Sequence, residues 1–395
     1  MKMAILGTRG IPARYGGFET FAEEVSSRLV ERGVDVTVYC EAMDRRKIAS
    51  YKKIKLKYVP SFSAGPLTTI LFDLRCLWHA RRSFDVVYML GYGAALFCFI
   101  PRLWGKQVWI NMDGIEWARA KWNWLAKIWF KLMEAIAMWT ANRIIADAEG
   151  IRRHLESRHR YMPDCSVIPY GAPVFDGPPD PAPLKEWGLD PNGYYLVVCR
   201  LEPENHVLEI IEGFSRSSSS SLLVIVGAHL SGTIYVQRLL HINDERLRFI
   251  GTVFDQRKLQ ALRCHARVYF HGHSVGGTNP SLLEALGCGN IIIAHDNFFN
   301  REVAGDVGLY FKGPGDIPEI LAAVDSYSPE QQRVKADAAR CIIREKYDWD
   351  MIAAGYLSLI HESTSIPVVK NVCLARDKNL QFFPTYVKKH RSTTG

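Results

Sequence analysis

The 395-residue sequence lacks several patterns that would assign it directly to a class of protein. Its nine cysteines include no C-x-x-C pair and stand mostly in apolar runs, which argues against a zinc site or a disulfide framework and favours reduced, buried thiols. The glycine-rich segment after the first apolar run contains neither G-x-G-x-x-G nor G-x-x-x-x-G-K-[ST]. These absences argue against a dinucleotide-binding dehydrogenase and a P-loop nucleotide hydrolase.

The sequence also has no apolar run that predicts a membrane-spanning helix. The longest run, VVYMLGYGAALFCFI, is shorter than the about 20 residues that a spanning helix needs, and two glycines divide it. The N-terminus, MKMAILGTRG, lacks the pattern of a secretory signal peptide, so we expect a cytoplasmic protein. The net charge of +8 is small for a nucleic-acid binder, but it suits anionic small ligands or an anionic membrane surface.

The sequence does contain two series of alternating strand and helix patterns. Short apolar runs that are predicted to be strands lie at 3–6, 34–40, 85–90, 106–111, 141–148, 194–199, 222–227, 247–251, 266–270 and 290–294. Helical spacing follows most of these runs, and the alternation predicts two doubly wound α/β domains with parallel sheets. In such domains ligands bind beyond the carboxyl ends of the strands, so we expect the chemistry to lie in a cleft between the domains.

A segment rich in proline and glycine separates the two series and suggests the domain boundaries. We predict an N-terminal domain at residues 1–170, a linker at 171–192 and a C-terminal domain at 193–347. A last helical pattern at 348–362 closes the folded part. The basic tail at 363–395 is predicted to be partly disordered.

The motif GTRGIPARYGGFET follows the first predicted strand. Gly16 and Gly17 open a helix there, so free amides and the positive end of the helix dipole could meet an anionic ligand. Arg9 and Arg14 add positive charge to the same loop. The structural alternative is an ordinary turn between a strand and a helix.

The motif CRLEPEN places an arginine directly after a predicted strand. From this position Arg200 could form two hydrogen bonds to a diphosphate. The alternative is a surface ion pair with Glu202 or Glu204. The position at the carboxyl end of a strand favours the functional interpretation.

The motif HSVGGTNPSLLEALGCG combines a glycine turn with an apolar helix. Pro280 suits the first helical position, and Asn279 or Thr278 suits the cap. The amides of Gly277, Thr278 and Asn279 could hold a phosphate, and the Glu284 carboxylate could accept both hydroxyls of a ribose. The alternative role of Glu284 is stabilisation of the helix dipole, which contributes about 0.3–1 kcal/mol.

One further carboxylate and two metal-like patterns need an interpretation. Asp113 follows a predicted strand and could act as a general base, although an aspartate before a glycine is also common in turns. Asp348 and Asp350 form a D-x-D pattern, which we interpret as a helix cap because no glycine loop is near it. His271 and His273 have no third metal ligand nearby, so one or both are expected to line the cleft and no metal site is predicted.

Residues 117–143 hold half of the ten tryptophans of the sequence. On a helical projection Lys127 and Lys131 share one face, whereas Leu125 and Leu132 lie roughly opposite. Tryptophan with lysine on an amphipathic helix is typical of a segment that lies on a membrane surface. A core helix is the alternative interpretation.

With these motifs in view, the sequence resembles glycosyltransferase family 4, the retaining enzymes with the GT-B fold. GTRGIPARYGGFETF, NMDGIEW, ADAEGIRRHL, RLEPEN and HGHSVGGTNPSLLEALGCG are similar to the bacterial rhamnosyltransferase-type subgroup and occur in the order of that family. The resemblance implies two Rossmann-like domains that face across a cleft, with the final helix crossing back to the N-terminal domain. It implies a nucleotide sugar bound by the C-terminal domain and no metal or other cofactor.

The resemblance also implies roles for particular residues. Arg200 matches the diphosphate arginine of the family, and Glu284 matches the second glutamate of its E-x7-E motif, the ribose contact. Two positions depart from the pattern, because the first glutamate falls at Gly276 and a frequent lysine falls at Asn205. The expected catalytic residues are Asp113, Arg200 and Glu284. The expected donor-binding residues are Gly16, Gly17, Arg9, Asn205, His273, Gly276, Gly277, Thr278 and Asn279.

The function that the resemblance implies is transfer of a hexose or 6-deoxyhexose in the synthesis of a cell-surface polysaccharide or lipopolysaccharide. The departure at Gly276 fits a donor with a different hydroxyl pattern, and L-rhamnose from dTDP-rhamnose is the expected one. The acceptor would be a lipid-linked or growing polysaccharide, met at the cytoplasmic face of the inner membrane. A GT-B sugar-nucleotide epimerase and a non-catalytic homologue that binds sugar nucleotides are the alternatives.

Overall fold

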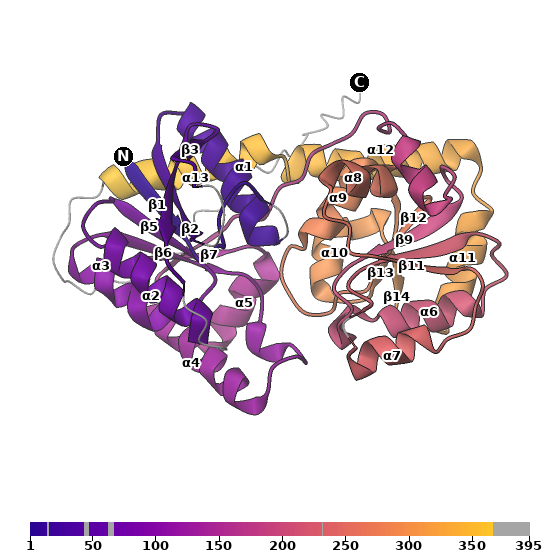
Figure 1. Ribbon diagram of the computed structural model, residues 1–395, viewed down its shortest axis with the longest axis horizontal. Helices are drawn as coiled ribbons and strands as arrows, with labels where there is room; N and C mark the ends of the chain where they lie inside the picture. The colour runs from indigo at the N-terminus through magenta and orange to yellow at the C-terminus, as the bar shows by residue number, and fades with distance from the viewer. Residues whose placement is uncertain (14–15, 43–46, 62–66, 231, 366–395) are drawn as a thin grey trace, which may run out of the picture.

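The computed structural model describes residues 1–13, 16–42, 47–61, 67–230 and 232–365. Two α/β halves lie side by side along the long axis of the molecule (Figure 1). The basic tail that the sequence predicts to be partly disordered lies outside the described residues from position 366 onward.

The first half is built on an eight-stranded sheet. Its strands are β1 (Lys2–Leu6), β2 (Asp35–Glu41), β3 (Ser50–Tyr51), β4 (Ile54–Val59), β5 (Val86–Leu90), β6 (Gln107–Met112), β7 (Arg143–Ala146) and β8 (Asp164–Val167). The strand order is β3-β4-β2-β1-β5-β6-β7-β8. Every neighbouring pair is parallel except β3 and β4.

Helices cover both faces of this sheet. They are α1 (Gly17–Glu31), α2 (Thr68–Ala80), α3 (Phe99–Leu103), α4 (Trp124–Thr140) and α5 (Glu149–Arg158). The central strand β1 shows why both faces need a cover. Met3 and Ile5 pack in the same apolar cluster as Phe21 of α1, whereas Ala4 and Leu6 pack in a separate cluster with residues of α2 and α4. A continuous apolar run such as 3–6 of β1 is typical of a parallel sheet that is buried on both sides.

The second half repeats this architecture. Its strands are β9 (Tyr194–Val198), β10 (Leu222–Val226), β11 (Leu247–Gly251), β12 (Val268–His271), β13 (Ile291–His295) and β14 (Leu309–Phe311), in the order β11-β10-β9-β12-β13-β14, all parallel. Its helices are α6 (Val207–Ser215), α7 (Ile234–Leu240), α8 (Gln256–Cys264), α9 (Pro280–Cys288), α10 (Phe298–Ala304), α11 (Ile317–Asp325) and α12 (Pro329–Lys346).

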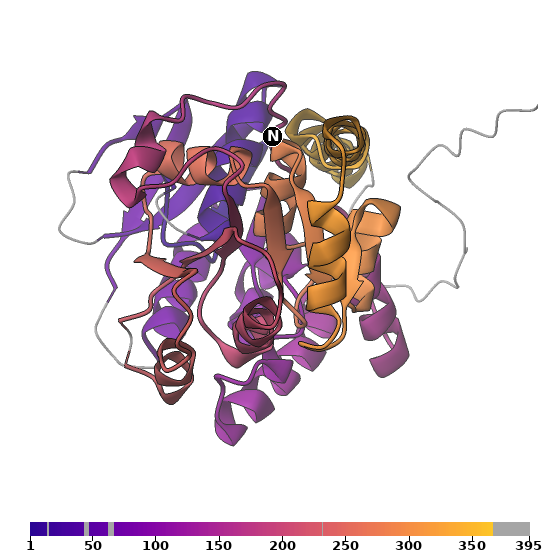
Figure 2. The ribbon, with the colours of Figure 1, turned by 90° about the vertical axis from the view of Figure 1, so that its right-hand side faces the viewer.

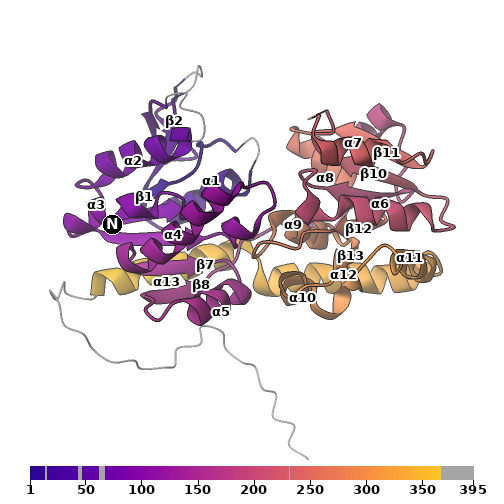
Figure 3. The same cartoon turned by 90° about the horizontal axis from the view of Figure 1, so that it is seen from below.

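The last described helix, α13 (Trp349–Ser365), returns to the first half. Tyr356 of α13 packs edge-on against Phe21, and its hydroxyl lies 2.9 Å from that of Tyr88. At the start of α13, Asp350 accepts a hydrogen bond of 2.8 Å from Arg32 at the end of α1. In Figure 3, α12 and α13 follow one another along one side of both halves, and Figure 2 shows the two helices nearly end-on. The predicted crossing helix is therefore confirmed.

The predicted strands match the long, buried strands of both sheets, but four observed strands lie outside the predicted ranges. These are β3, β4, β8 and β14. In β4 only the two terminal residues, Ile54 and Val59, are buried, and lysines interrupt the apolar pattern. The other three are only two to four residues long, and so short a run gives no periodic signal. No helix among the described residues is long and apolar enough to cross a membrane.

Candidate active site

A cavity of about 780 Å³ lies between the two halves, where loops at the carboxyl ends of both sheets face each other. The first half contributes the start of α1 and the loop after β6, and the second half contributes the loops after β9 and β12. The candidate residues that line it are Asp113, Arg200, Glu284, Gly16, Gly17, Asn205, His273, Gly276, Gly277, Thr278 and Asn279. The tertiary structure thus brings together side chains from distant parts of the sequence.

Arg9 is the candidate that the structure does not bring to this cavity. Its guanidinium forms an ion pair of 2.9 Å with Glu41 at the end of β2, and its side chain is 67% exposed. Arg14 lies outside the described residues. The side chain of Arg9 therefore adds no positive charge to the wall of the cavity.

The first turn of α1, next to the glycine loop, contains an acid that the sequence analysis did not single out. The Glu19 carboxylate accepts hydrogen bonds from the Thr8 hydroxyl at 3.0 Å and from the Arg9 amide at 2.9 Å. Gly16 has φ 122°, and a Cβ there would lie 2.1 Å from the Glu19 carboxylate, so only glycine fits. As predicted, α1 begins at Gly17. The start of α1 therefore presents the Glu19 carboxylate to the cavity, next to the backbone of Gly16 and Gly17.

The glycine turn before α9 is held by a local cap and by the other half of the molecule. The helix begins at Pro280, and the Asn279 side chain accepts from the Ser281 amide at 2.9 Å, which confirms the predicted cap. The Thr278 hydroxyl donates to the carbonyl oxygen of Asp147 in the first half. The turn is thus anchored on both sides, and its amides lie in the wall of the cavity.

Glycines allow the two halves to approach closely at this turn. A Cβ on Gly277 would lie 1.9 Å from the Asp147 carboxylate, and a Cβ on Gly114 would lie 2.9 Å from the Cα of Gly276. Gly276 has φ 141°, a conformation that residues with side chains rarely adopt. A residue with a side chain would therefore be strained at position 276 by its φ, although a Cβ there would meet no atom within 4 Å.

Two carboxyl groups of the first half lie near this contact. Asp113 accepts a hydrogen bond of 3.2 Å from the Tyr170 hydroxyl, and burial raises the pKa of Asp113 while the Arg119 cation opposes that rise. Asp147, which the sequence analysis did not single out, is 1% exposed, and neither of its carboxylate oxygens has a hydrogen-bond partner among the residues that the structure describes. Burial, and then the Asp113 charge, hold the pKa of Asp147 well above its usual range. Asp113 is the member of the pair that faces the cavity.

Arg200 lies at the opposite wall, after β9. Its Nε atom is 3.9 Å from a Glu202 carboxylate oxygen, and its side chain is 46% exposed, so the guanidinium retains donors for a ligand. The Asn205 side chain donates a 2.6 Å hydrogen bond to the carbonyl oxygen of Arg200 and so stabilises the turn. Arg119 and Lys121, which the sequence analysis did not single out, line the same cavity.

His273 is a neutral member of the cavity wall. Burial, followed by the positive charges of Arg200 and Arg119, lowers the pKa of His273 to about 3. Its ring stacks on His271 at a centroid distance of 4.4 Å. Among the residues that the structure describes, no group of three or more histidine, cysteine or acidic side chains could hold a metal ion.

Glu284 has a partner that the sequence did not reveal. Its carboxylate forms an ion pair of 2.7 Å with Arg263 of α8, whose side chain is 7% exposed. A buried cation needs such a partner, because an uncompensated charge in the interior is strongly destabilising. The Glu284 carboxylate therefore neutralises Arg263 and still lines the cavity.

The D-x-D pattern is a helix cap, as predicted. The Asp348 carboxylate accepts hydrogen bonds from the Asp350 amide at 2.8 Å and from the Met351 amide at 3.3 Å. Asp350 is engaged by Arg32 and by Arg28 of α1. The Asp348 carboxylate therefore caps α13, and the Asp350 carboxylate joins α13 to α1.

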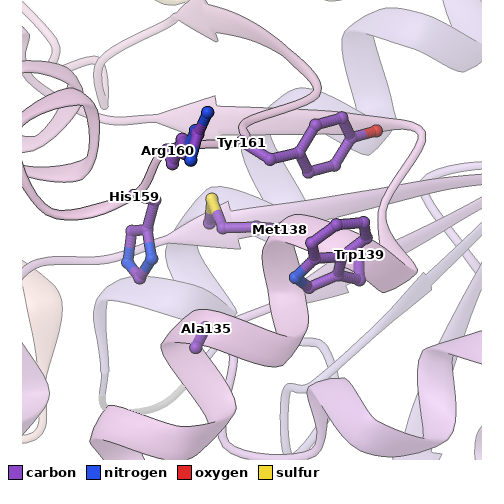
Figure 4. A pocket seen from close by; sticks show the side chains of 6 residues that line it. All are labelled: Ala135, Met138, Trp139, His159, Arg160 and Tyr161. Atoms are coloured by element: carbon purple, nitrogen blue, oxygen red, sulfur yellow. The ribbon is translucent and has the colours of Figure 1, made fainter. Parts of the chain in front are cut away.

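A second cavity, of about 420 Å³, lies at the end of α4 (Figure 4). Its lining residues are Ala135, Met138, Trp139, His159, Arg160 and Tyr161, and the rings of Trp139 and Tyr161 stack at 4.5 Å. None of the candidate residues lines it.

Comparison with known proteins supports the architecture. A family described as a domain of unknown function, DUF1972, matches residues 1–173. No curated protein matches the chain. A sucrose-phosphate synthase from Thermosynechococcus elongatus is 14% identical, with a TM-score of 0.76, over 92% of this chain and 99% of that chain.

Two further structures have the same arrangement. HepE from Anabaena, in complex with UDP and glucose, is 15% identical, with a TM-score of 0.72, over 92% of this chain and 100% of that chain. A glycosyltransferase from Rickettsia africae is 13% identical, with a TM-score of 0.70, over 92% of this chain and 98% of that chain. The chain therefore has the GT-B fold, two Rossmann-like halves that face across a cleft, as the sequence predicts.

Proposed function

We propose that this protein is a glycosyltransferase that uses a nucleotide diphosphate sugar as donor. The observation that carries the proposal is the single cavity in which Arg200, Glu284 and the amides of 277–279 come together at the carboxyl ends of two sheets. The diphosphate and the ribose of a nucleotide sugar are complementary to these groups, because an arginine and a helix N-terminus bind phosphate and a carboxylate accepts hydrogen bonds from ribose hydroxyls. HepE from Anabaena, which has a similar fold and whose structures hold UDP and glucose or UDP-glucose, supports the same class.

The chemistry follows from where charge develops. The departing nucleoside diphosphate gains negative charge in the transition state, and the Arg200 guanidinium and the amides near Gly277 stabilise it. The Glu284 carboxylate accepts hydrogen bonds from the hydroxyl groups of the ribose. Asp113, or the departing phosphate, takes the proton of the acceptor hydroxyl as the new glycosidic bond forms. We propose that the anomeric configuration is retained and that no metal ion or cofactor takes part.

The donor sugar is proposed from the loop at Gly276. Position 276 is a glycine with φ 141°, so it offers no carboxylate to accept hydrogen bonds from the sugar hydroxyls. A 6-deoxyhexose has one hydroxyl group fewer than a hexose that could donate a hydrogen bond to a carboxylate. L-rhamnose from dTDP-rhamnose is therefore the proposed donor.

The acceptor is proposed to be a lipid-linked oligosaccharide or growing polysaccharide at the cytoplasmic face of the inner membrane. Helix α4 supports this proposal, although within the predicted segment 117–143 the α-helix runs only over Trp124–Thr140. The apolar side chains that α4 exposes are Trp124, Leu125, Ile128, Leu132 and Trp139, and its buried face is formed around Met133 and Ala137. The helix thus covers the sheet with one face and leaves a second apolar face uncovered.

The exposed apolar surface continues onto α2 and α3, which lie on the same side of the first sheet as α4 (Figure 1). Trp78 and Trp104 pack edge to face at 6.3 Å, and the Arg81 guanidinium lies 3.9 Å from the Trp78 ring. Over their whole described lengths, α2, α3 and α4 contain only two acids, Asp73 and Glu134, and both are buried. An apolar surface with cations and no exposed acid suits an anionic bilayer.

We expect the double variant Ile128→Ser, Leu132→Ser to bind anionic lipid vesicles roughly tenfold more weakly than the wild type, because two apolar side chains no longer enter the interface. Co-sedimentation at low salt measures the binding. Ile234→Ser, on an exposed apolar residue of the second half, is the matched control and should bind like the wild type. Equal binding by all three proteins would contradict membrane contact through α4.

The proposed reaction is tested by measuring nucleoside diphosphate release from a panel of nucleotide sugars, with and without a lipid-linked acceptor. We expect one donor to raise the melting temperature and to release its diphosphate only when the acceptor is present. Release without an acceptor would favour the sugar-nucleotide epimerase. Binding without any release would favour a non-catalytic homologue, and no binding at all would refute the proposal.

A further inference from the structure

Two cysteines of the second half meet at the ends of neighbouring helices. Cys264 is the last residue of α8 and Cys288 is the last residue of α9, and their sulfur atoms lie 2.6 Å apart. A disulfide bond is about 2.05 Å long, so the two sulfur atoms need only a small movement to join. Cys264 is partly exposed, whereas Cys288 is buried.

The thiol pair lies beside the ion pair of the cavity wall. Arg263 immediately precedes Cys264, and Glu284 stands one helical turn before Cys288. The side chains of Arg263 and Glu284 are joined at 2.7 Å. The same two helices therefore carry both the thiols and the carboxylate that is proposed to bind the ribose.

We propose that Cys264 and Cys288 form a reversible disulfide and that this modification weakens binding of the donor nucleotide. The second part rests on the proposed function, whereas the first part does not. Reversible disulfides in proteins of a reducing compartment are usually regulatory or catalytic rather than structural. The pair is therefore a modification site that the sequence, which contains no C-x-x-C pattern, does not reveal.

The oxidant is a small-molecule disulfide such as glutathione disulfide. The more accessible Cys264 attacks one of its sulfur atoms as a thiolate and releases one glutathione, which leaves a mixed disulfide on Cys264. Cys288 then attacks the Cys264 sulfur and releases the second glutathione. The two protein thiols lose two protons and two electrons in total, and the glutathione disulfide is reduced to two glutathiones.

The bond acts on the cavity through the helices that it joins. In the reduced protein, no covalent bond joins the carboxyl ends of α8 and α9. A disulfide would fix these two ends relative to each other and so hold Glu284 in its contact with Arg263. The carboxylate is then less able to turn toward the two hydroxyl groups of a ribose.

The first experiment maps the bond in the full chain. After incubation with glutathione disulfide and alkylation of the remaining thiols, peptide mass spectrometry should find Cys264 linked to Cys288, and the melting temperature should rise by a few degrees. Dithiothreitol should reverse both changes. Cys264→Ser should abolish them, whereas Cys341→Ser, at an exposed cysteine elsewhere, should not. A wild-type protein without this cross-link would overturn the proposal.

The second experiment compares donor binding by the reduced and oxidised proteins. We expect the dissociation constant for the best nucleotide sugar to rise several-fold on oxidation in the wild type and in Cys341→Ser, but not in Cys264→Ser. A cross-linked protein with unchanged affinity would overturn the effect on the cavity. If the reduced protein binds no nucleotide sugar, the proposed function fails, while the mapping experiment still decides whether the disulfide forms.

Discussion

Arg200→Ala is expected to lower kcat/KM for the nucleotide sugar by about 10²–10³-fold, the usual effect of removing one group that stabilises a developing anion. The guanidinium lines the cavity, and within the described part of the chain its ion pair is the long contact of 3.9 Å with Glu202. Loss of the guanidinium therefore removes positive charge from the diphosphate site. The surrounding fold loses no strong interaction. Steady-state kinetics with a labelled donor measure the effect.

Two controls make the Arg200 result specific. Arg238→Ala, on an exposed face of α7, removes the same charge from the second half and should leave kcat/KM unchanged. Arg200→Lys keeps the charge but cannot form two parallel hydrogen bonds to a diphosphate, so it should recover only part of the activity. Wild-type turnover by Arg200→Ala would show that the diphosphate binds elsewhere.

Asp113→Asn is expected to lower kcat by about 10²–10⁴-fold if the carboxylate is the base that takes the proton of the acceptor. The base works only when it is ionised, and burial raises the pKa of Asp113. Activity should therefore fall as the pH decreases through a value above the about 3.9 of an ordinary aspartate. A pH profile of kcat/KM measures the position of this limb.

Tyr170→Phe tests the same group without removing it. The Tyr170 hydroxyl donates to the Asp113 carboxylate at 3.2 Å and lowers the pKa of Asp113, so its loss should move the acidic limb to higher pH. Asp190→Asn, at an exposed aspartate outside the cavity, should leave the profile unchanged. An unchanged limb in Tyr170→Phe, together with high activity in Asp113→Asn, would assign the proton to the departing phosphate instead.

The sequence predicted the fold class and most of the candidate site because both leave local signals. Continuous apolar runs identify buried parallel strands, and glycine, proline and asparagine at fixed positions identify the turn before α9. Arg200 and Asp113 could be recognised because each directly follows a strand, and parallel strands present their carboxyl ends at one edge of a sheet. The cap at Asn279 and the start of α1 at Gly17 follow from the same local chemistry.

Only the tertiary structure decided the contacts between distant segments. Arg263 forms an ion pair with Glu284, and the Asp147 carboxylate lies against Gly277. The Glu19 carboxylate accepts a hydrogen bond from the Arg9 amide. No periodicity or spacing in the sequence connects the members of these pairs. Arg9 shows the reverse case, since its position in the loop suggested the cleft but Glu41 holds its side chain elsewhere.

The physical reason for this division is the range of the interactions. Helix, strand and turn preferences depend on neighbours within a few residues, so the sequence by itself determined the two Rossmann-like halves and the loops at the carboxyl ends of their strands. Partners of a buried charge are chosen by packing across the whole fold, because a buried cation such as Arg263 can pair only with an opposite group that the packing brings near. The tertiary structure therefore decided that Gly114 lies against Gly276 across the cleft, where a Cβ on Gly114 would lie 2.9 Å from the Cα of Gly276.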